Sequence, residues 1–451
     1  MSLNEEGGDW RVDNFLHALL KETELNRDLK IKPLQLGSDG LWLVYYESIV
    51  NYQETVDFIW NSRTTPPPTE SFSDLCSRLA GKELTSDDMN KLHQNQVVLL
   101  DPNGERAFSF LGKLNNLSRA IASPENEFLP FAPAVTFMES LTTNIGLLRN
   151  AFNSKELKIE GFTFTGAATK EASLIYNAKR VDKELLDQVR SCLQKASDRD
   201  LQNGQDLIKV LGCNRMNLFP PFYKTEIPAQ AIYSILKGRV LLMIDGEPVA
   251  YVLPLLFSDF IALEWDTQFP ILIMLGLRSL RILSLLIALL TPGLYVALVS
   301  VNPEALRTEL ALSVASSRTG IPLPTFLEML FLLIVSEITI ESTQRLSKVI
   351  GATVTLTSGI VLGTAIVEAK LVSSLVIIVL SISATANFAF PNYINSLSIR
   401  LMRVGMIVPA GMFGVFGLFG SFIAICFYVC AIERFGVPFM SFLDTRRIGQ
   451  T

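Results

Sequence analysis

The feature that most constrains this chain is the stretch from Gln268 to Ile432, where long apolar segments follow one another. The stretch contains nine Lys and Arg, six Glu, and no Asp or His. A helix of roughly 20 residues crosses about 30 Å of hydrocarbon. Five segments reach that length, at 282–301, 321–340, 349–367, 371–390 and 405–430. The stretch predicts an all-α polytopic membrane domain of about five spans.

The residues before this stretch have the composition of an ordinary charged, soluble protein. The net charge of the whole chain is −5, which does not support nucleic-acid binding, because that function needs a clustered basic face. The first residues, MSLNEEGGDWRVDN, are acidic and lack the apolar core of a signal peptide. We therefore expect the soluble half to be cytoplasmic. The five cysteines are too few and too scattered for a disulfide framework, and a reducing compartment suits them.

Three sequence blocks recur in the soluble half in the same order. LKI at 29–31 recurs at 157–159, LVYYESIVN at 43–51 recurs as LIYNAKRVD at 174–182, and VVLLDPNGE at 97–105 recurs as LLMIDGE at 241–247. These blocks predict an α/β cytoplasmic domain of two tandem related units. The expected divisions are a first unit at 1–130 with a proline-rich linker at 64–69, a linking helix and second unit at 131–253, the membrane domain at 254–440, and a tail at 441–451.

The linking helix is expected between Pro130 and Phe152. Thr136 is its expected N-cap, because Glu139 follows three residues later and this spacing is typical of a capping box.

The soluble half carries no pattern that indicates catalysis. Its two histidines, His17 and His93, have no cysteine or carboxylate at metal-binding spacing. Gly112 and Lys113 do not form a phosphate-binding loop, because no Ser or Thr follows the lysine. We expect no enzyme activity, no catalytic residue, no cofactor and no metal site. The soluble half is interpreted as a binding or scaffolding module.

The second predicted span carries three carboxylates, and a carboxylate in an apolar helix is a functional candidate because burying it unpaired is costly. Glu328 lies near one end of the span. Glu341 lies four residues before Arg345, which predicts an ordinary ion pair at the helix end. Glu337 lies one turn deeper on the same face as Glu341. It is a candidate for a polar path, and it faces either a polar cavity or a neighbouring helix.

The third and fourth spans supply further polar candidates. Thr353, Thr357 and Thr364 lie on nearly one face of a helix, and they either bond to their own helix carbonyls or line a hydrated path. Asn387 ends the fourth span, where neighbours or water must satisfy it. Glycines at regular spacing favour close helix packing. They are Gly359 and Gly363 in the third span, and Gly411, Gly414, Gly417 and Gly420 in the fifth.

The distribution of basic residues does not settle the orientation. Five spans with the N-terminus inside leave Arg434, Arg446 and Arg447 outside, contrary to the positive-inside rule. A sixth pass, or a re-entrant segment at 254–277, would return the tail to the cytoplasm.

From roughly Asn14 to Pro438 the chain resembles the A subunits of the nutrient germinant receptors of spore-forming bacteria. Where that family has Pro-Arg-Glu-Gly-Phe, this chain has PAVTF at 133–137, which suggests a divergent member or a channel-like paralogue. The matching stretches are Glu139-Ser140-Leu141 with Asn144-Ile145, Thr225-Glu226 with Pro228, GRVLLMIDGEP at 238–248, LYVALVSVNPE at 294–304, the spaced Ser316, Arg318, Gly320 and Pro322, PNY at 391–393 and FGVP at 435–438.

The resemblance implies a subunit of a germination receptor in the spore inner membrane, assembled with a transporter-like B subunit and a lipoprotein C subunit. It implies that A subunits form an oligomeric, ligand-gated cation channel that triggers germination when nutrients are sensed. Two alternatives remain open at the level of sequence. One is a secondary transporter, against which stands the lack of an inverted repeat of broken spans. The other is a membrane-anchored scaffold or signalling subunit with no pore of its own.

Overall fold

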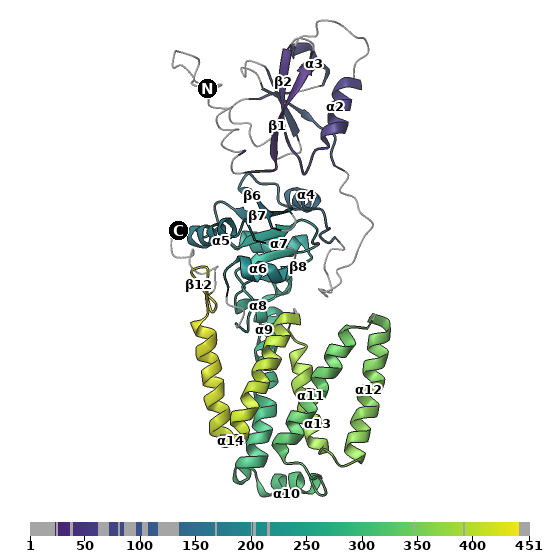
Figure 1. Cartoon of the computed structure of the whole chain (residues 1–451), viewed down its shortest axis with the longest axis vertical. Helices are drawn as coiled ribbons and strands as arrows, with labels where there is room; N and C mark the ends of the chain where they lie inside the picture. The colour runs from purple at the N-terminus through teal and green to yellow at the C-terminus, as the bar shows by residue number, and fades with distance from the viewer. Residues whose placement is uncertain are drawn as a thin grey trace. The chain divides into compact units, whose positions relative to one another are not determined.

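The computed structural model in Figure 1 describes residues 23, 26–36, 39–61, 72–79, 82–84, 96–101, 107–115, 135–166, 169–199, 201, 204–213, 217–346, 348–390 and 393–441. The predicted linker at 64–69 and both histidines lie outside these residues. The chain forms two compact units. One comprises Met1–Met216, Pro221–Leu255 and Leu443–Thr451, and the other comprises Asn217–Pro220 and Leu256–Phe442.

The first unit begins with a five-stranded antiparallel sheet in the order β1-β2-β4-β5-β3. β2 and β4 are inner strands, and apart from Trp42, which is 42% exposed, their apolar residues are almost fully buried. Ile59 and Leu75 from two helices complete the core against Leu43 and Val98. The elements are β1 (Leu29–Leu36), β2 (Asp39–Tyr46), α2 (Tyr52–Asn61), α3 (Phe72–Arg78), β3 (Lys82–Glu83), β4 (Gln96–Leu100) and β5 (Ala107–Leu111).

A second five-stranded antiparallel sheet has the order β6-β7-β9-β10-β8. Counted along the chain, this order is the same as that of the first sheet. The repeated sequence blocks begin on corresponding strands, LKI on β1 and β6, for example. The elements are α4 (Leu141–Ala151), β6 (Leu157–Thr165), β7 (Thr169–Asn177), α5 (Lys183–Lys195), α6 (Gly204–Val210), β8 (Tyr223–Thr225), α7 (Pro228–Leu236), β9 (Val240–Ile244) and β10 (Ala250–Leu253).

The linking helix α4 begins later than predicted. Its N-cap is Ser140, whose side chain accepts a hydrogen bond from the Thr143 amide, so the predicted cap at Thr136 is wrong. The cause is a competing extended segment before the helix. Phe137 donates its amide to the Glu226 carbonyl at 2.9 Å and is buried, which keeps this part of the chain out of the helix.

The second unit is helical, and Figure 1 shows its long helices side by side. Among the described residues, two helical segments are long and apolar enough to cross a membrane, Ile271–Val301 and Asn395–Ala431. The elements are α8 (Ser258–Ile261), the short 3-10 helix η2 (Glu264–Gln268), α9 (Ile271–Val296), η3 (Ala297–Val301), η4 (Pro303–Ala305), α10 (Thr308–Ser317), α11 (Thr325–Gln344), α12 (Lys348–Glu368), α13 (Ser374–Asn387), α14 (Tyr393–Ala431), β11 (Glu433–Arg434) and β12 (Val437–Pro438).

α14 consists of two helical arms that meet at Gly414. The backbone there has φ 62° and ψ −139°, which a residue with a side chain rarely adopts. A Cβ atom at Gly417 would overlap the Pro409 carbonyl, so the two arms approach closely after the turn. Figure 1 shows the arms running in opposite directions. The predicted span over 405–430 is therefore not one continuous helix.

Candidate functional site

The polar candidate Glu337 lies on α11 and contacts two arginines on α14. Arg400 donates from Nη1 to Glu337 Oε2 at 2.7 Å, and Arg403 donates from Nη2 to Oε1 at 3.3 Å. Arg400 and Arg403 are three residues apart, which places both side chains on one face of the first arm of α14. The arginine side chains are 6% and 3% exposed, and that of Glu337 is 32% exposed. Glu337 thus faces a neighbouring helix.

The contact extends through α13 to α9. Arg403 donates from Nη1 to Ser383 Oγ at 3.1 Å, and Ser383 donates to the Ala288 carbonyl at 2.9 Å. We call Glu337, Arg400, Arg403 and Ser383 the arginine cluster. It links four helices and holds two guanidinium groups to one carboxylate. Burying charge in an apolar domain is expensive, so a cluster of this composition is a candidate for a functional rather than a purely structural role.

Asn387 lies one turn after Ser383 on α13 and is 4% exposed. Its Nδ2 donates to Ser396 Oγ on α14 at 2.6 Å. The structure therefore places two of the predicted polar residues, Glu337 and Asn387, against the same arm of α14.

The predicted threonine stripe lies elsewhere, on α12. Thr353, Thr357 and Thr364 are all exposed in the isolated chain. Thr357 donates to the Thr353 carbonyl and Thr364 to the Ile360 carbonyl, both at 2.9 Å. The hydroxyls of Thr357 and Thr364 are thus satisfied by their own helix, as one of the two sequence interpretations requires. The stripe takes no part in the arginine cluster.

The predicted packing glycines divide into two groups. Three of the glycines on α14 serve contacts within the chain. Gly411 accommodates the Phe326 ring of α11, which would lie 2.7 Å from an added Cβ, while Gly414 and Gly417 form the turn between the arms. The other group has open space where a side chain would be. It comprises Gly359, Gly363 and Gly420.

Two further carboxylates of α11 are paired. Glu341 accepts from Arg345 at 3.0 Å, which confirms the predicted ion pair. Glu328 is fully buried, accepts from Arg318 at 2.9 Å and from the Ser373 amide at 3.2 Å, and so joins α11 to the start of α13. Sequence reasoning missed this pair. Its only signal was an arginine in the loop before α11.

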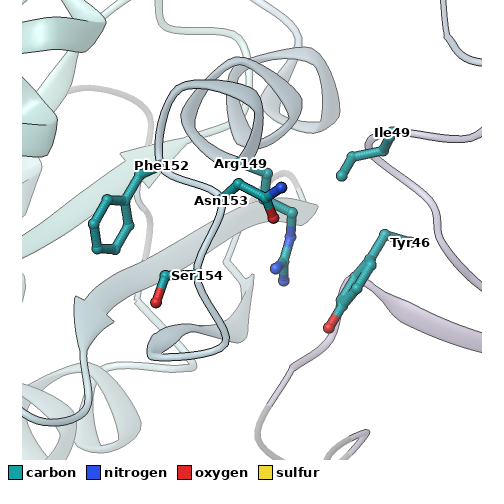
Figure 2. A pocket seen from close by; sticks show the side chains of 6 residues that line it. All are labelled: Tyr46, Ile49, Arg149, Phe152, Asn153 and Ser154. Atoms are coloured by element: carbon teal, nitrogen blue, oxygen red, sulfur yellow. The ribbon is translucent and has the colours of Figure 1, made fainter. Parts of the chain in front are cut away.

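A buried ion pair that the sequence did not reveal lies in the α/β unit. Arg149 of α4 donates from Nε to Asp28 Oδ2 at 2.6 Å, and both side chains are 4% exposed. Figure 2 shows Arg149 in the middle of a small pocket, with Phe152 and Ser154 on one side of it and Tyr46 on the other. The guanidinium carbon lies 4.0 Å from the centre of the Tyr46 ring. The pocket is lined by Tyr46, Ile49, Arg149, Phe152, Asn153 and Ser154.

Two of the sequence blocks behind the family resemblance touch each other in the α/β unit. Gly246 donates its amide to the Glu139 carbonyl at 2.8 Å, and Asp245 accepts from the Leu141 amide at 3.2 Å. Asn144 is buried and bonds to the backbone of Met138 through both its oxygen and its nitrogen. Ile145 is buried beside it. These contacts hold the start of α4 in place, so the blocks have a structural role at this position.

Comparison with known proteins identifies the family. Residues 16–450 match the family described as Bacillus/Clostridium GerA spore germination protein. The chain is 30% identical over 323 residues to spore germination protein B1 of Bacillus subtilis (strain 168), which covers 72% of this chain and 67% of that protein. It is 29% identical over 361 residues to spore germination protein GerLA of Bacillus cereus, which covers 80% of this chain and 73% of that protein.

Among solved structures, the N-terminal domain of the A subunit of the Bacillus megaterium spore germinant receptor GerK3 aligns at 19% identity with a TM-score of 0.40, over 54% of this chain and 94% of that domain. The family match alone spans nearly the whole chain. This chain belongs to the GerA family of spore germination proteins.

Proposed function

We propose that this chain is an A subunit of a spore germinant receptor, and that copies of it form an oligomeric, ligand-gated path for monovalent cations in the spore inner membrane. In this proposal the α/β unit is cytoplasmic. A transporter-like B subunit and a lipoprotein C subunit are its partners, and nutrient sensed by the assembly opens the path. We also propose that the two sheets of the α/β unit, each with its helices, arose by duplication of one ancestral segment. The shared strand order of the two sheets supports this.

The observation that carries the proposal is the exposed threonine stripe of α12. Successive residues of an α-helix are about 100° apart, so Thr353, Thr357 and Thr364 fall within a narrow sector. α12 packs mainly against α11 within the chain, which leaves that sector uncovered. Three hydroxyls aligned along an apolar helix would find no further hydrogen-bond partners if they faced lipid. They suit a hydrated path, because each oxygen retains acceptor capacity after donating to its own helix.

A path of this kind needs more than one copy of the chain. One helix cannot enclose water, whereas α12 helices from several copies around an axis can. Gly359 and Gly363 have open space beside them and lie on α12 away from the threonine sector. Small residues at this spacing permit close helix contact, so they suit the sides of α12 that meet neighbouring copies.

Cysteine accessibility tests the proposal directly. In the full chain with Cys192, Cys213, Cys426 and Cys430 replaced by serine, we expect Thr357→Cys in proteoliposomes to react with a membrane-impermeant thiol reagent. Leu356→Cys is the matched control. It is exposed in the isolated chain but lies roughly 100° from Thr357 around the helix axis, and we expect it to react at least about tenfold more slowly. Equal and slow reaction at both positions would show a lipid-facing stripe and contradict the proposal.

A measurement of cation flux tests the same proposal through function. Thr357→Val keeps the shape of the side chain but removes the hydroxyl, and we expect it to reduce potassium flux through liposomes that hold the reconstituted receptor. Thr385→Val is the control, since Thr385 lies on α13, is exposed, and donates to its own helix in the same way. A path lined by α12 requires that only the first variant reduce the flux. Saturable nutrient uptake by the chain alone would instead favour a transporter.

A further inference from the structure

Arg434 is a buried cation close to the end of the second arm of α14. It lies on β11, which is joined to β12 by a tight turn, with Arg434 opposite Val437. The residue is 8% exposed. Its Nη2 donates to the Phe219 carbonyl at 3.2 Å. The Asn217 amide oxygen, in its favoured orientation, accepts from Nη1 at 3.1 Å and from Nη2 at 2.7 Å.

All of these partners are neutral. Within the described part of the chain, no carboxylate forms an ion pair with Arg434, and its Nε atom has no hydrogen-bond partner. Glu433 is the adjacent residue, but its side chain is exposed and makes no such pair. A guanidinium that is nine-tenths buried keeps its charge at any physiological pH. Its burial without a counter-ion is therefore a cost that a bound anion would offset.

The same residue lines a cavity of about 200 Å³ in the helical unit. This volume is large compared with the 10–15 Å³ that one water needs on the same measure, so a small anion and several waters fit. The lining is mostly polar and includes the Asn217 amide and the Tyr428 hydroxyl. The residues are Asn217, Tyr428, Ala431, Ile432, Glu433 and Arg434.

We propose that this cavity is a binding site for a phosphate group, held by the Arg434 guanidinium with the Asn217 amide and the Tyr428 hydroxyl as further donors. Guanidinium binds phosphate oxygens through charge-assisted hydrogen bonds, which are stronger than neutral ones. The site lies where the apolar sequence of α14 ends at Ala431, beside a tyrosine. In membrane proteins this combination of tyrosine and arginine occurs at the level of the lipid headgroups.

Two sources can supply the phosphate, the headgroup of an anionic phospholipid or a free phosphate ion. Tyr428 already accepts a hydrogen bond from the Leu218 amide at 3.0 Å, which leaves its own hydrogen available to a ligand. The segment that carries Asn217 and Phe219 is anchored by ring contacts, with the Phe219 and Phe439 rings 5.0 Å apart. The donors are thus held in place before any ligand arrives. The site involves neither α12 nor the arginine cluster, so it stands independently of the ion path.

The test uses the full chain in nanodiscs and follows its thermal unfolding midpoint, because a ligand that binds only the folded state raises that midpoint. One arm titrates inorganic phosphate against chloride at constant ionic strength in phosphatidylcholine discs. The other compares phosphatidylcholine discs with discs that also contain phosphatidylglycerol. A rise with inorganic phosphate identifies a free-phosphate site. A rise with phosphatidylglycerol alone identifies a headgroup site. No rise in either arm overturns the proposal.

Asn217→Asp is the decisive variant. It places a carboxylate beside Arg434 and supplies the missing counter-charge, so we expect the chain to fold with an unchanged or higher midpoint and to lose affinity for the phosphate probe by at least about tenfold. Arg434→Gln should lose the same response if it folds. Arg345→Gln, which changes an exposed arginine on another helix, should respond as the wild type does. An undiminished response in Asn217→Asp would overturn the assignment of the site.

Discussion

Each unit of this protein contains a buried arginine held by a carboxylate, and the two arrangements differ in their balance of charge. In the α/β unit, Asp28 and Arg149 form a pair with equal and opposite charges, and both side chains are 4% exposed. The Asp28 carboxylate also accepts from the amide and hydroxyl of Ser48, at 2.9 and 2.7 Å. The carboxylate oxygens and the guanidinium are well supplied with partners, which is the condition under which a buried ion pair is tolerated.

In the helical unit, one carboxylate serves two arginines. Glu337 lies 2.7 Å from Arg400 and 3.3 Å from Arg403, and it is far more exposed than Asp28. The longer contact and the surplus positive charge leave this arrangement less saturated than the pair of Asp28 and Arg149. The comparison teaches that a neutral, saturated pair fixes two elements together. A shared carboxylate instead suits helices that must change their relative position, as gating of the proposed path requires.

The largest expected effect comes from breaking the saturated pair. Arg149→Met keeps much of the side-chain volume but leaves Asp28 buried and unpaired, and we expect it to destabilise the α/β unit by about 3–5 kcal/mol. Hydrogen exchange of the β1 and α4 amides in the full chain measures this loss.

The double variant Asp28→Leu with Arg149→Met serves as the control, because it removes the pair altogether. It should recover most of the lost stability, since an apolar replacement of a buried ion pair is often neutral. If Arg149→Met cost less than about 1 kcal/mol of stability, water would have to reach Asp28 in solution. Asp28 and Glu337 would then not differ in burial as the comparison requires.

Breaking the shared contact should cost less stability and more function. Glu337→Gln removes the carboxylate that Arg400 and Arg403 share, and we expect about 2–3 kcal/mol less stability where α11 meets α14. The gating proposal predicts cation leak through the reconstituted receptor without nutrient.

Ser383→Ala is the matched control for Glu337→Gln. It removes the bond from Arg403 and the bond to the Ala288 carbonyl but leaves the Glu337 carboxylate in place, and it should cost about 1–2 kcal/mol without leak. Equal behaviour of Glu337→Gln and Ser383→Ala would mean that the charge balance of the cluster has no bearing on gating.

Local patterns in the sequence predicted the elements that depend on local contacts. The repeated blocks lie on corresponding strands because short runs rich in β-branched and aromatic residues specify strands directly. The pair of Glu341 and Arg345 was predictable because residues four apart on a helix are neighbours. The presence of long apolar helices followed from composition and length in the same way.

Contacts between distant residues carried no such signal. Arg400 lies 63 positions after Glu337, and Arg149 lies 121 positions after Asp28, so no periodicity connects the members of either pair. The turn at Gly414 could not be predicted from the sequence for another reason. Glycine at every third position is typical of a helix packing face, and the same glycines also permit a reversal of the chain. Only the packing of the two arms selects the second possibility.

Another ion pair of the α/β unit, between Glu160 and Arg190, adds a dependence on pH. Burial raises the pKa of Glu160, but hydrogen bonds from Arg190 at 2.6 Å and from Tyr176 at 2.6 Å outweigh it, so the pKa lies below its ordinary value of 4.5. The lowered pKa means that this group's contribution to stability is fully present above pH 4.5 and is lost as the pH falls through the folded-state pKa.

We therefore expect Glu160→Gln to cost about 1–2 kcal/mol at neutral pH and to flatten the acid limb of the stability curve of β6 and β7. Hydrogen exchange of those strands across the acid range checks both expectations. An acid limb that is as steep in the variant as in the wild type would assign the pH dependence to another carboxylate.

The smallest effect is expected at the exposed pair of Glu341 and Arg345, which lies on the same helix as Glu337. Its side chains are 58% and 78% exposed, so water and salt screen the attraction, and Arg345→Gln should change the stability of α11 by about 0.3–0.5 kcal/mol. The change should vanish at high salt, whereas that of Glu337→Gln should persist, because buried charges are screened much less. When the stability changes of Arg345→Gln and Glu337→Gln are compared, the effect of burial on an ion pair is separated from the effect of charge alone, on one helix. A salt-insensitive loss at Arg345 would indicate that this end of α11 is covered, as it would be in an assembly of several copies.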